Sequence, residues 1–134
     1  MRILVCGDRN WTNHELILNK LKEVAGKENE IILIHGCCQG ADEISEKVLW
    51  YAKRICGICV DSTCYFNVVR FPADWDKYGK AAGLIRNQQM IDEGKPDIVL
   101  AFHNNIAKSK GTMDMIKRAN AAGVEVRIYA DEKK

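Results

Sequence analysis

Residues 31–42 of the chain read IILIHGCCQGAD and connect a strand pattern to a helix pattern. The four apolar residues Ile31–Ile34 are typical of a buried strand, and a helical period begins after Asp42. Between them lies a short turn of small residues that contains Gly36 and Gly40. The first N–H groups of a helix lack partners and carry the positive end of the helix dipole. The stretch therefore predicts an anion site at the Gly36–Gly40 turn.

The same alternation of apolar runs and helix-period segments continues along the chain, without an internal repeat or a break in composition. Such alternation predicts a parallel sheet with helices on both faces. We therefore predict one Rossmann-like, three-layer α/β domain over residues 1–134, with a five-stranded, mainly parallel sheet and a ligand site beyond the carboxyl ends of the strands. The expected strands are Ile3–Cys6, Ile31–Ile34, Val68–Phe71, Asp97–Phe102 and Val124–Tyr129.

Helices are expected between these strands, and each has a start or stop signal. The first follows a cap at Thr12 or Asn13, the second runs from Asp42 to about Ile55, the third from about Lys80 to Glu93, and the last from Gly111 to Ala121. Residues 56–65, 73–79 and 103–110 are expected to be loops.

The 134 residues carry a net charge of only +2, and the basic residues are spread along the chain. Nucleic-acid-binding proteins usually show a basic stripe, so the composition argues against that class of partner. No apolar run approaches the roughly 18 residues of a membrane-spanning helix. Met1–Asn10 has the pattern of a first strand rather than of a signal peptide. We therefore expect a cytoplasmic protein with no membrane partner.

The six cysteines are expected to be thiols, since nothing in the sequence indicates secretion. Three follow or end apolar strands, where a small apolar residue is expected: Cys6, Cys37 and Cys38. The others are weak candidates for a metal or redox site, because the first two have metal-ligand spacing: Cys56, Cys59 and Cys64. A closed zinc site needs a fourth ligand. A loop with free thiols is therefore the favoured interpretation, and no metal or cofactor is expected.

Glycine and polar residues follow the first four expected strands at the carboxyl edge of the sheet. Ligands bind at this edge in doubly wound folds. The residues expected to contact a ligand there are Gly7, Arg9, His35, Gly36, Gly40, Asp42, Asp74, Trp75, Gly111 and Thr112. A phosphate is expected near Gly36–Gly40 and Gly111–Thr112.

Several of these residues also have a purely structural interpretation. Asp42 can cap its helix, Asp74 can organise the loop before Trp75, and the glycines can serve turn geometry alone. His35 can belong to the hydrogen bonding of its turn or act as an acid, and Trp75 can pack against the protein or stack on a base.

Arg86 and Asn87 form the sharpest single feature of the sequence. They share one face of the expected third helix with Gly83 and Met90, in a segment of mostly small or apolar residues. Arginine is suited to bidentate contacts with phosphate or carboxylate groups. The alternative is a solvent-exposed Arg86 that pairs with Asp92 or Glu93. We favour ligand contact by both Arg86 and Asn87.

Several spaced motifs together resemble the YspA-like, cpYpsA-related branch of the SLOG superfamily. They are GDRNW at 7–11, HGCCQGAD at 35–42, FPADW at 71–75, YGKAAGLIRNQQM at 78–90, DIVLAF at 97–102 and GTMDM at 111–115. The superfamily includes the Lonely Guy phosphoribohydrolases and the Rossmann-like domain of DNA-processing protein A. The resemblance spans nearly the whole chain, and it implies a Rossmann-like fold with a pocket for nucleotides or nucleotide-derived ligands.

Lonely Guy enzymes cleave the N-glycosidic bond of nucleoside monophosphates and carry an R-K-x-x-M helix and a GGxGTxxE motif. The segment from Arg86 to Met90 resembles the first motif and places Arg86 at the catalytic arginine position. Gly111-Thr112 matches the GT of the second, but Met115 stands at the Glu position, with Asp114 beside it.

The first functional hypothesis is therefore binding of a nucleotide-derived small molecule by a sensor or sequestering module. The alternative is a nucleotide phosphoribohydrolase or N-glycosidase that uses Arg86 with Asp114 or Asp42 as catalytic residues. Single-stranded DNA binding, by analogy with DNA-processing protein A, is less favoured because of the near-neutral charge. Since Lonely Guy proteins pair, the resemblance also implies a homo-oligomer.

Overall fold

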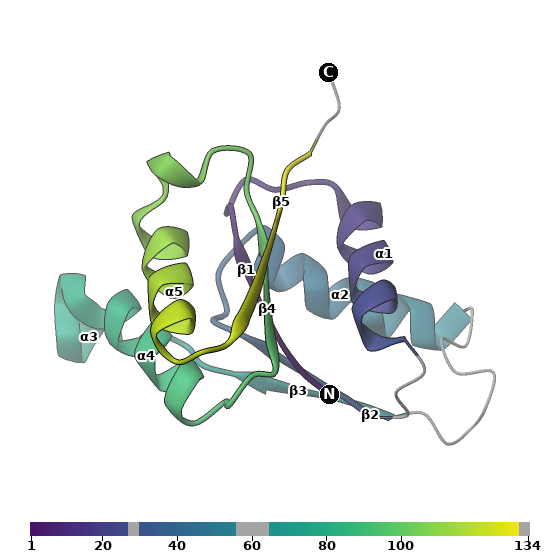
Figure 1. Cartoon of the computed structure of the whole chain (residues 1–134), viewed down its shortest axis with the longest axis horizontal. Helices are drawn as coiled ribbons and strands as arrows, with labels where there is room; N and C mark the ends of the chain where they lie inside the picture. The colour runs from purple at the N-terminus through teal and green to yellow at the C-terminus, as the bar shows by residue number, and fades with distance from the viewer. Residues whose placement is uncertain (27–29, 56–64, 132–134) are drawn as a thin grey trace.

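The computed structural model describes residues 1–26, 30–55 and 65–131. Its strands are β1 (Arg2–Gly7), β2 (Glu30–His35), β3 (Tyr65–Arg70), β4 (Ile98–Phe102) and β5 (Glu125–Tyr129). All neighbouring strands are parallel, and their order across the sheet is β3-β2-β1-β4-β5 (Figure 1). The predicted five-stranded parallel sheet is confirmed over the described residues.

Helices pack on both faces of this sheet. The helices α1 (His14–Ala25) and α2 (Ala41–Ile55) lie on one face, and α4 (Ala82–Asp92) and α5 (Lys110–Ala121) lie on the other (Figure 1). Successive β1 residues alternate between the two cores, so that Ile3 packs toward α1 and α2 while Leu4 packs toward α4 and α5. The central strands are apolar throughout because both of their faces are buried. The predicted three-layer Rossmann-like fold is confirmed.

The first two helices begin at positions that the local sequence defines. Asn13 is the N-cap of α1, and its side chain accepts the N–H of Leu16 at 3.0 Å. Thr12, the alternative cap, does not take this role. The helix α2 begins at Ala41, immediately after Gly40, whose φ of 77° lies in the left-handed region.

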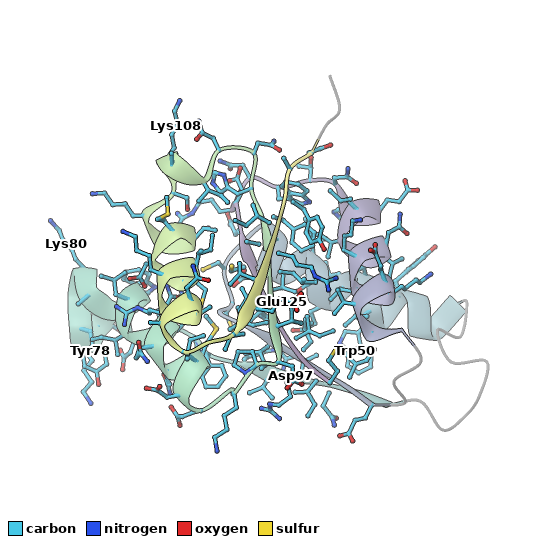
Figure 2. The ribbon with its side chains drawn as sticks, viewed as in Figure 1. Trp50, Tyr78, Lys80, Asp97, Lys108 and Glu125 are labelled. Carbon is cyan, nitrogen blue, oxygen red and sulfur yellow. The ribbon has the colours of Figure 1, made fainter. Side chains whose placement is uncertain are left out.

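The prediction of a loop over residues 73–79 is wrong. The segment contains a short helix, α3 (Trp75–Tyr78), followed by a 3₁₀ turn, η1 (Gly79–Ala81). Asp74 caps α3 by accepting the N–H of Lys77 at 3.1 Å, and Gly79 ends it with a φ of 56°. One helical turn is too short for a hydrophobic period to appear in the sequence. Figure 2 shows Tyr78 and Lys80 at the end of the molecule formed by this segment.

Several other element boundaries differ from the sequence expectation by a few residues, and the start of β3 and the segment after β4 differ most. The strand β3 begins three residues before the expected Val68, because it pairs with β2 over its whole length, from Glu30 opposite Tyr65 to His35 opposite Arg70. The expected loop over residues 103–110 contains a second 3₁₀ turn, η2 (Ile106–Lys108). Neither difference changes the topology.

The carboxyl ends of β1 and β4 lie next to each other at the centre of the sheet, where Cys6 pairs with Ala101 and Gly7 with Phe102. After β1 the chain continues to β2 on one side, and after β4 it continues to β5 on the other side. Loops that diverge in this way open a crevice, which is where open α/β sheets bind their ligands.

Candidate functional site

A cavity of about 370 Å³ lies at this divergence. Its walls come from the carboxyl end of β1, the loop between β2 and α2, the segment α3–α4, and the start of α5. We call it the Arg86 cavity. Eight residues singled out in the sequence line it: Gly7, Arg9, Asp42, Trp75, Arg86, Asn87, Gly111 and Thr112. The structure thus brings together residues from five separate motifs.

Arg86 extends from α4 to the loop between β2 and α2. Its Nη1 donates to the carbonyl oxygen of Gly36, its Nη2 contacts the Cys38 Sγ at 3.7 Å, and its Nε donates to the Asn87 Oδ1 at 3.1 Å. In the described part of the chain Arg86 makes no ion pair with Asp92 or Glu93, which was the alternative position for its side chain. Its guanidinium therefore lies in the wall of the cavity.

The loop between β2 and α2 requires glycine at positions 36 and 40 for different physical reasons. A Cβ at Gly36 would lie 2.4 Å from the Arg86 Nη1, so the missing side chain makes room for the guanidinium. A Cβ at Gly40 would lie 2.2 Å from the carbonyl oxygen of Asp8, and its backbone is left-handed. Neither residue is among those that line the cavity. Turn geometry accounts for Gly40, whereas Gly36 permits the position of Arg86.

Asp42 occupies the place where the sequence predicted an external anion. It is 5% exposed, and its carboxylate accepts the N–H groups of Gly36 at 2.9 Å and Cys38 at 3.4 Å. The expectation that these two N–H groups bind an external anion is therefore wrong, because an internal carboxylate already satisfies them. Burial raises the pKa of Asp42, and the N–H donors oppose that rise only in part.

The start of α5 forms the opposite wall. Ser109 is the N-cap, and its hydroxyl oxygen accepts the N–H of Thr112 at 3.2 Å. Asn87 on α4 donates from its amide to the carbonyl oxygen of Gly111 at 3.2 Å, which fixes the helix start against α4. The N–H groups of the first helical turn, at Lys110 and Gly111, have no partners within the helix. This wall supplies N–H donors that can bind an anion.

The position that Lonely Guy enzymes fill with a glutamate faces the cavity, but as an apolar side chain. Met115 lines the cavity and is 1% exposed. The neighbouring Asp114 does not line it; its Oδ2 accepts hydrogen bonds from the Arg118 Nε at 2.7 Å and the Asn87 Nδ2 at 3.0 Å. Asp42 is therefore the carboxylate that lines the cavity among the described residues.

The charge around the cavity is mainly positive. Among the described lining residues the basic side chains are Arg9, Lys80, Arg86 and Lys110, against the carboxylate of Asp42. Trp75, which is 57% exposed, and Leu84 add an apolar rim. The sequence analysis did not identify Lys80 and Lys110 as lining residues. Their positions could have indicated this, because Lys80 lies just before α4 and Lys110 is the first residue of α5, where a side chain can reach the carboxyl edge of the sheet.

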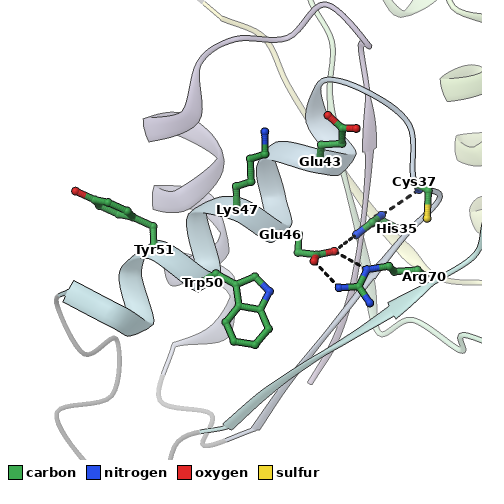
Figure 3. Close-up of a pocket in the computed structure, with 8 residues that line it drawn as sticks. All are labelled: His35, Cys37, Glu43, Glu46, Lys47, Trp50, Tyr51 and Arg70. Carbon is green, nitrogen blue, oxygen red and sulfur yellow. Dashed lines mark hydrogen bonds and ion pairs between the residues drawn. The ribbon is translucent and has the colours of Figure 1, made fainter.

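His35, which was expected to contact the ligand, lines a different cavity beside α2 (Figure 3). It is 3% exposed; its Nε2 contacts the Glu46 Oε1 at 2.7 Å, and its Nδ1 accepts the N–H of Cys37 at 3.0 Å. Arg70 also donates to Glu46, and this hydrogen bond is the main reason that the pKa of Glu46 falls to about 2. The hydrogen-bonding role considered for His35 is the one observed. Asp74, the cap of α3, likewise does not line the Arg86 cavity.

The cysteines that the structure describes, Cys6, Cys37 and Cys38, are free thiols. Cys6 is buried as expected for a small apolar residue, but Cys37 is exposed, with a φ of 62°. No cluster of three or more His, Cys, Asp or Glu side chains that could hold a metal ion occurs within residues 1–26, 30–55 and 65–131. The weak metal candidates Cys56, Cys59 and Cys64 lie outside these ranges.

No helix over the described residues combines the length and the apolar character needed to cross a membrane.

Comparison with known proteins gives two matches. A family model described as the YspA, cpYpsA-related SLOG family matches residues 1–54, the part that includes β1, β2 and the loop bearing Gly36 and Asp42. The "Gene 61 protein" of Mycobacterium phage D29 is 30% identical over 134 residues, and the alignment covers 98% of both chains. The chain belongs to the YspA, cpYpsA-related SLOG family.

Proposed function

We propose that the chain binds a nucleotide or a nucleotide-derived small molecule in the Arg86 cavity, as a sensor or sequestering module in the cytoplasm. Membership of the SLOG family suggests a nucleotide-related role. The observation that carries the proposal is the guanidinium of Arg86 in a cavity wall, surrounded by further basic side chains and an exposed tryptophan. The free thiols of the described cysteines fit a reducing compartment.

The parts of the cavity correspond to the parts of a nucleotide. The phosphate would lie between Arg86, Lys110 and the first turn of α5, where charge-assisted hydrogen bonds and helix N–H groups are available. The base would stack on Trp75 at the rim. The volume of about 370 Å³ lies within the range of about 300–1,000 Å³ that is usual for small-molecule pockets.

Asp42 gives a specific reason to keep N-glycosidic hydrolysis as a second candidate function. Its carboxyl group lines the cavity, and burial raises its pKa, as is common for general acids. In that reaction the glycosidic C–N bond would break as Asp42 protonates the departing base, while Arg86 holds the phosphate. The water that adds to the anomeric carbon would lose a proton, which returns Asp42 to its protonated form. Met115 at the family Glu position and the hydrogen bonds of Asp114 leave Asp42 as the better placed acid.

Incubation with AMP, GMP, CMP, UMP, NAD and ADP-ribose, followed by native and product mass spectrometry, separates the two functions. We expect the wild type to retain an intact nucleotide and Arg86→Ala to retain much less of it. Release of free base by the wild type and not by Arg86→Ala would make the protein a glycosidase.

The matched control is Arg127→Ala, which removes an arginine whose Nε donates to Glu125 on the edge strand β5. It should behave as the wild type. Retention of no nucleotide from the panel, or equal retention by Arg86→Ala, would contradict the proposed site.

A further inference from the structure

Asn87 is enclosed between α4 and α5, with every polar atom of its side chain hydrogen-bonded. The residue is 4% exposed. Its Nδ2 donates to the Gly111 carbonyl oxygen at 3.2 Å and to the Asp114 Oδ2 at 3.0 Å, while its Oδ1 accepts the Arg86 Nε–H at 3.1 Å. The opposite amide orientation would place an NH₂ group against the Arg86 Nε–H and an oxygen against two acceptors, so these partners fix the amide orientation.

Asp114 is itself held in place by Arg118, one turn further along α5. The Arg118 Nε donates to the same Asp114 Oδ2 at 2.7 Å, and the Arg118 Nη1 donates to the Gln88 Oε1 on α4 at 2.7 Å. The side chains of Asp114 and Arg118 are 22% and 29% exposed. The carboxylate therefore has a defined position at the junction of the two helices and cannot easily turn toward the cavity.

We propose that Asp114 and Asn87 are positioning residues, which hold the guanidinium of Arg86 in the cavity through a chain of hydrogen bonds. Asp114 fixes the Asn87 amide, and the Asn87 Oδ1 fixes the Arg86 Nε–H, so that the two terminal nitrogens of Arg86 point at the loop between β2 and α2. The inference deepens the proposed function, because it assigns Asp114 a role in orienting Arg86 rather than in the chemistry.

A free arginine side chain has several rotatable bonds, and ordering it during binding costs conformational entropy. A side chain that is already ordered avoids that cost. Without Asp114 the Asn87 Nδ2 group loses one of its two acceptors, so the amide is held less firmly and offers the Arg86 Nε–H a less stable acceptor. We expect this to weaken ligand binding about ten-fold, the lower end of the loss found when a partner that orients a metal ligand is removed.

The position of Arg86 can be measured without any ligand, from the Nε–H resonance of its side chain in ¹H–¹⁵N NMR spectra, assigned by its loss in Arg86→Lys. We expect slow solvent exchange of this proton in the wild type and in Asp114→Asn, which keeps an acceptor oxygen. Exchange should be at least about five-fold faster in Asp114→Ala. The control Glu125→Gln, which removes the charge of the residue that pairs with Arg127 on β5, should match the wild type. Unchanged exchange in Asp114→Ala would overturn the proposal.

If Asp114→Ala does not fold, Arg118→Met provides the same test. It removes the ion pair that holds the Asp114 carboxylate in position. Exchange of the Arg86 Nε–H should again become faster, and unchanged exchange would again overturn the proposal.

Calorimetric titration with AMP then tests the functional consequence. Asp114→Ala should raise the Kd about ten-fold in the wild-type background and leave it unchanged in the Arg86→Ala background, since Asp114 acts only through Arg86. An equal effect in both backgrounds would overturn the proposal. If the wild type binds no nucleotide but the exchange results are as expected, the proposed function fails while the positioning role stands.

Discussion

At the scale of single residues, the close approach of Arg86 to Gly36 defines the candidate site. The guanidinium donates to a backbone carbonyl at a place where any side chain would collide with it. Besides the contacts of its terminal nitrogens with Gly36 and Cys38, the Arg86 guanidinium donates from Nε to the Asn87 Oδ1. The geometry of the arginine therefore depends on Gly36, which has no side chain, and on Asn87, which is almost fully buried.

Gly36→Ala should reproduce the binding defect of Arg86→Ala. Its Cβ would displace only the flexible end of Arg86, so the free energy of unfolding should change by no more than about 1 kcal/mol. Affinity for AMP, measured by isothermal titration calorimetry, should fall about ten-fold or more. A fully retained affinity would show that this position of Arg86 is not needed for binding.

Asp42 shows why sequence reasoning about single residues was incomplete. A strand that passes through a glycine turn into a helix predicts an anion site, and the structure does place a carboxyl group there, but it belongs to the protein. A sequence pattern reports the N–H donors and not whether a nearby carboxylate already takes them. Nor could it show that Asp114 faces Arg118 while Met115 faces the cavity, because neighbouring helix residues are about 100° apart and the helix rotation is set by packing.

At the scale of elements, Glu46 joins α2 to two strands of the sheet. It contacts His35 on β2 and accepts from Arg70 on β3. The hydrogen bond from Arg70, with a further contribution from His35, lowers the pKa of Glu46 from 4.5 to about 2. Since the folded-state pKa lies below the unfolded one, ionised Glu46 stabilises the fold above the unfolded pKa, and that stabilisation is lost as the pH falls toward 2.

Glu46→Gln should therefore reduce the free energy of unfolding at neutral pH by about 1 kcal/mol, less than the full pKa shift would give, because half-exposed Arg70 is screened by solvent. Urea unfolding of both proteins should show the difference shrinking as the pH is lowered from about 5 to about 2. Glu125→Gln, at an exposed ion pair, should show no such pH dependence. A difference that stays constant with pH would rule out this role.

The elements that sequence analysis placed well are those with long, regular patterns. The strands β1 and β4 are buried on both faces and appear as continuous apolar runs, so their existence and direction could be predicted. The helix α3 could not, because a single turn with no buried residue leaves no period in the sequence. This element matters for the site, since it carries Trp75 to the rim of the cavity.

At the scale of the whole molecule, the strand order decides where the candidate site lies. The chain diverges after β1 and β4, and the Arg86 cavity occupies the crevice between them. The alternating pattern and the right-handed connection rule predicted a ligand site at the carboxyl edge of the sheet, but not the strand order that places the cavity beside β1 and β4. Nor did they predict that His35 lines a second cavity, because this depends on how α2 packs against β1 and β2 and leaves His35 facing Glu46 and Arg70.

The most direct test of the central claim is to titrate AMP and ADP-ribose into ¹⁵N-labelled protein and follow its ¹H–¹⁵N NMR spectrum. The indole N–H of Trp75, the Nε–H of Arg86 and the amides of Gly7, Gly36 and Gly111 should shift. The indole of Trp50, beside the second cavity, should not. Shifts confined to Trp50, Cys37 and Glu46, or no shifts with either nucleotide, would contradict nucleotide binding in the Arg86 cavity.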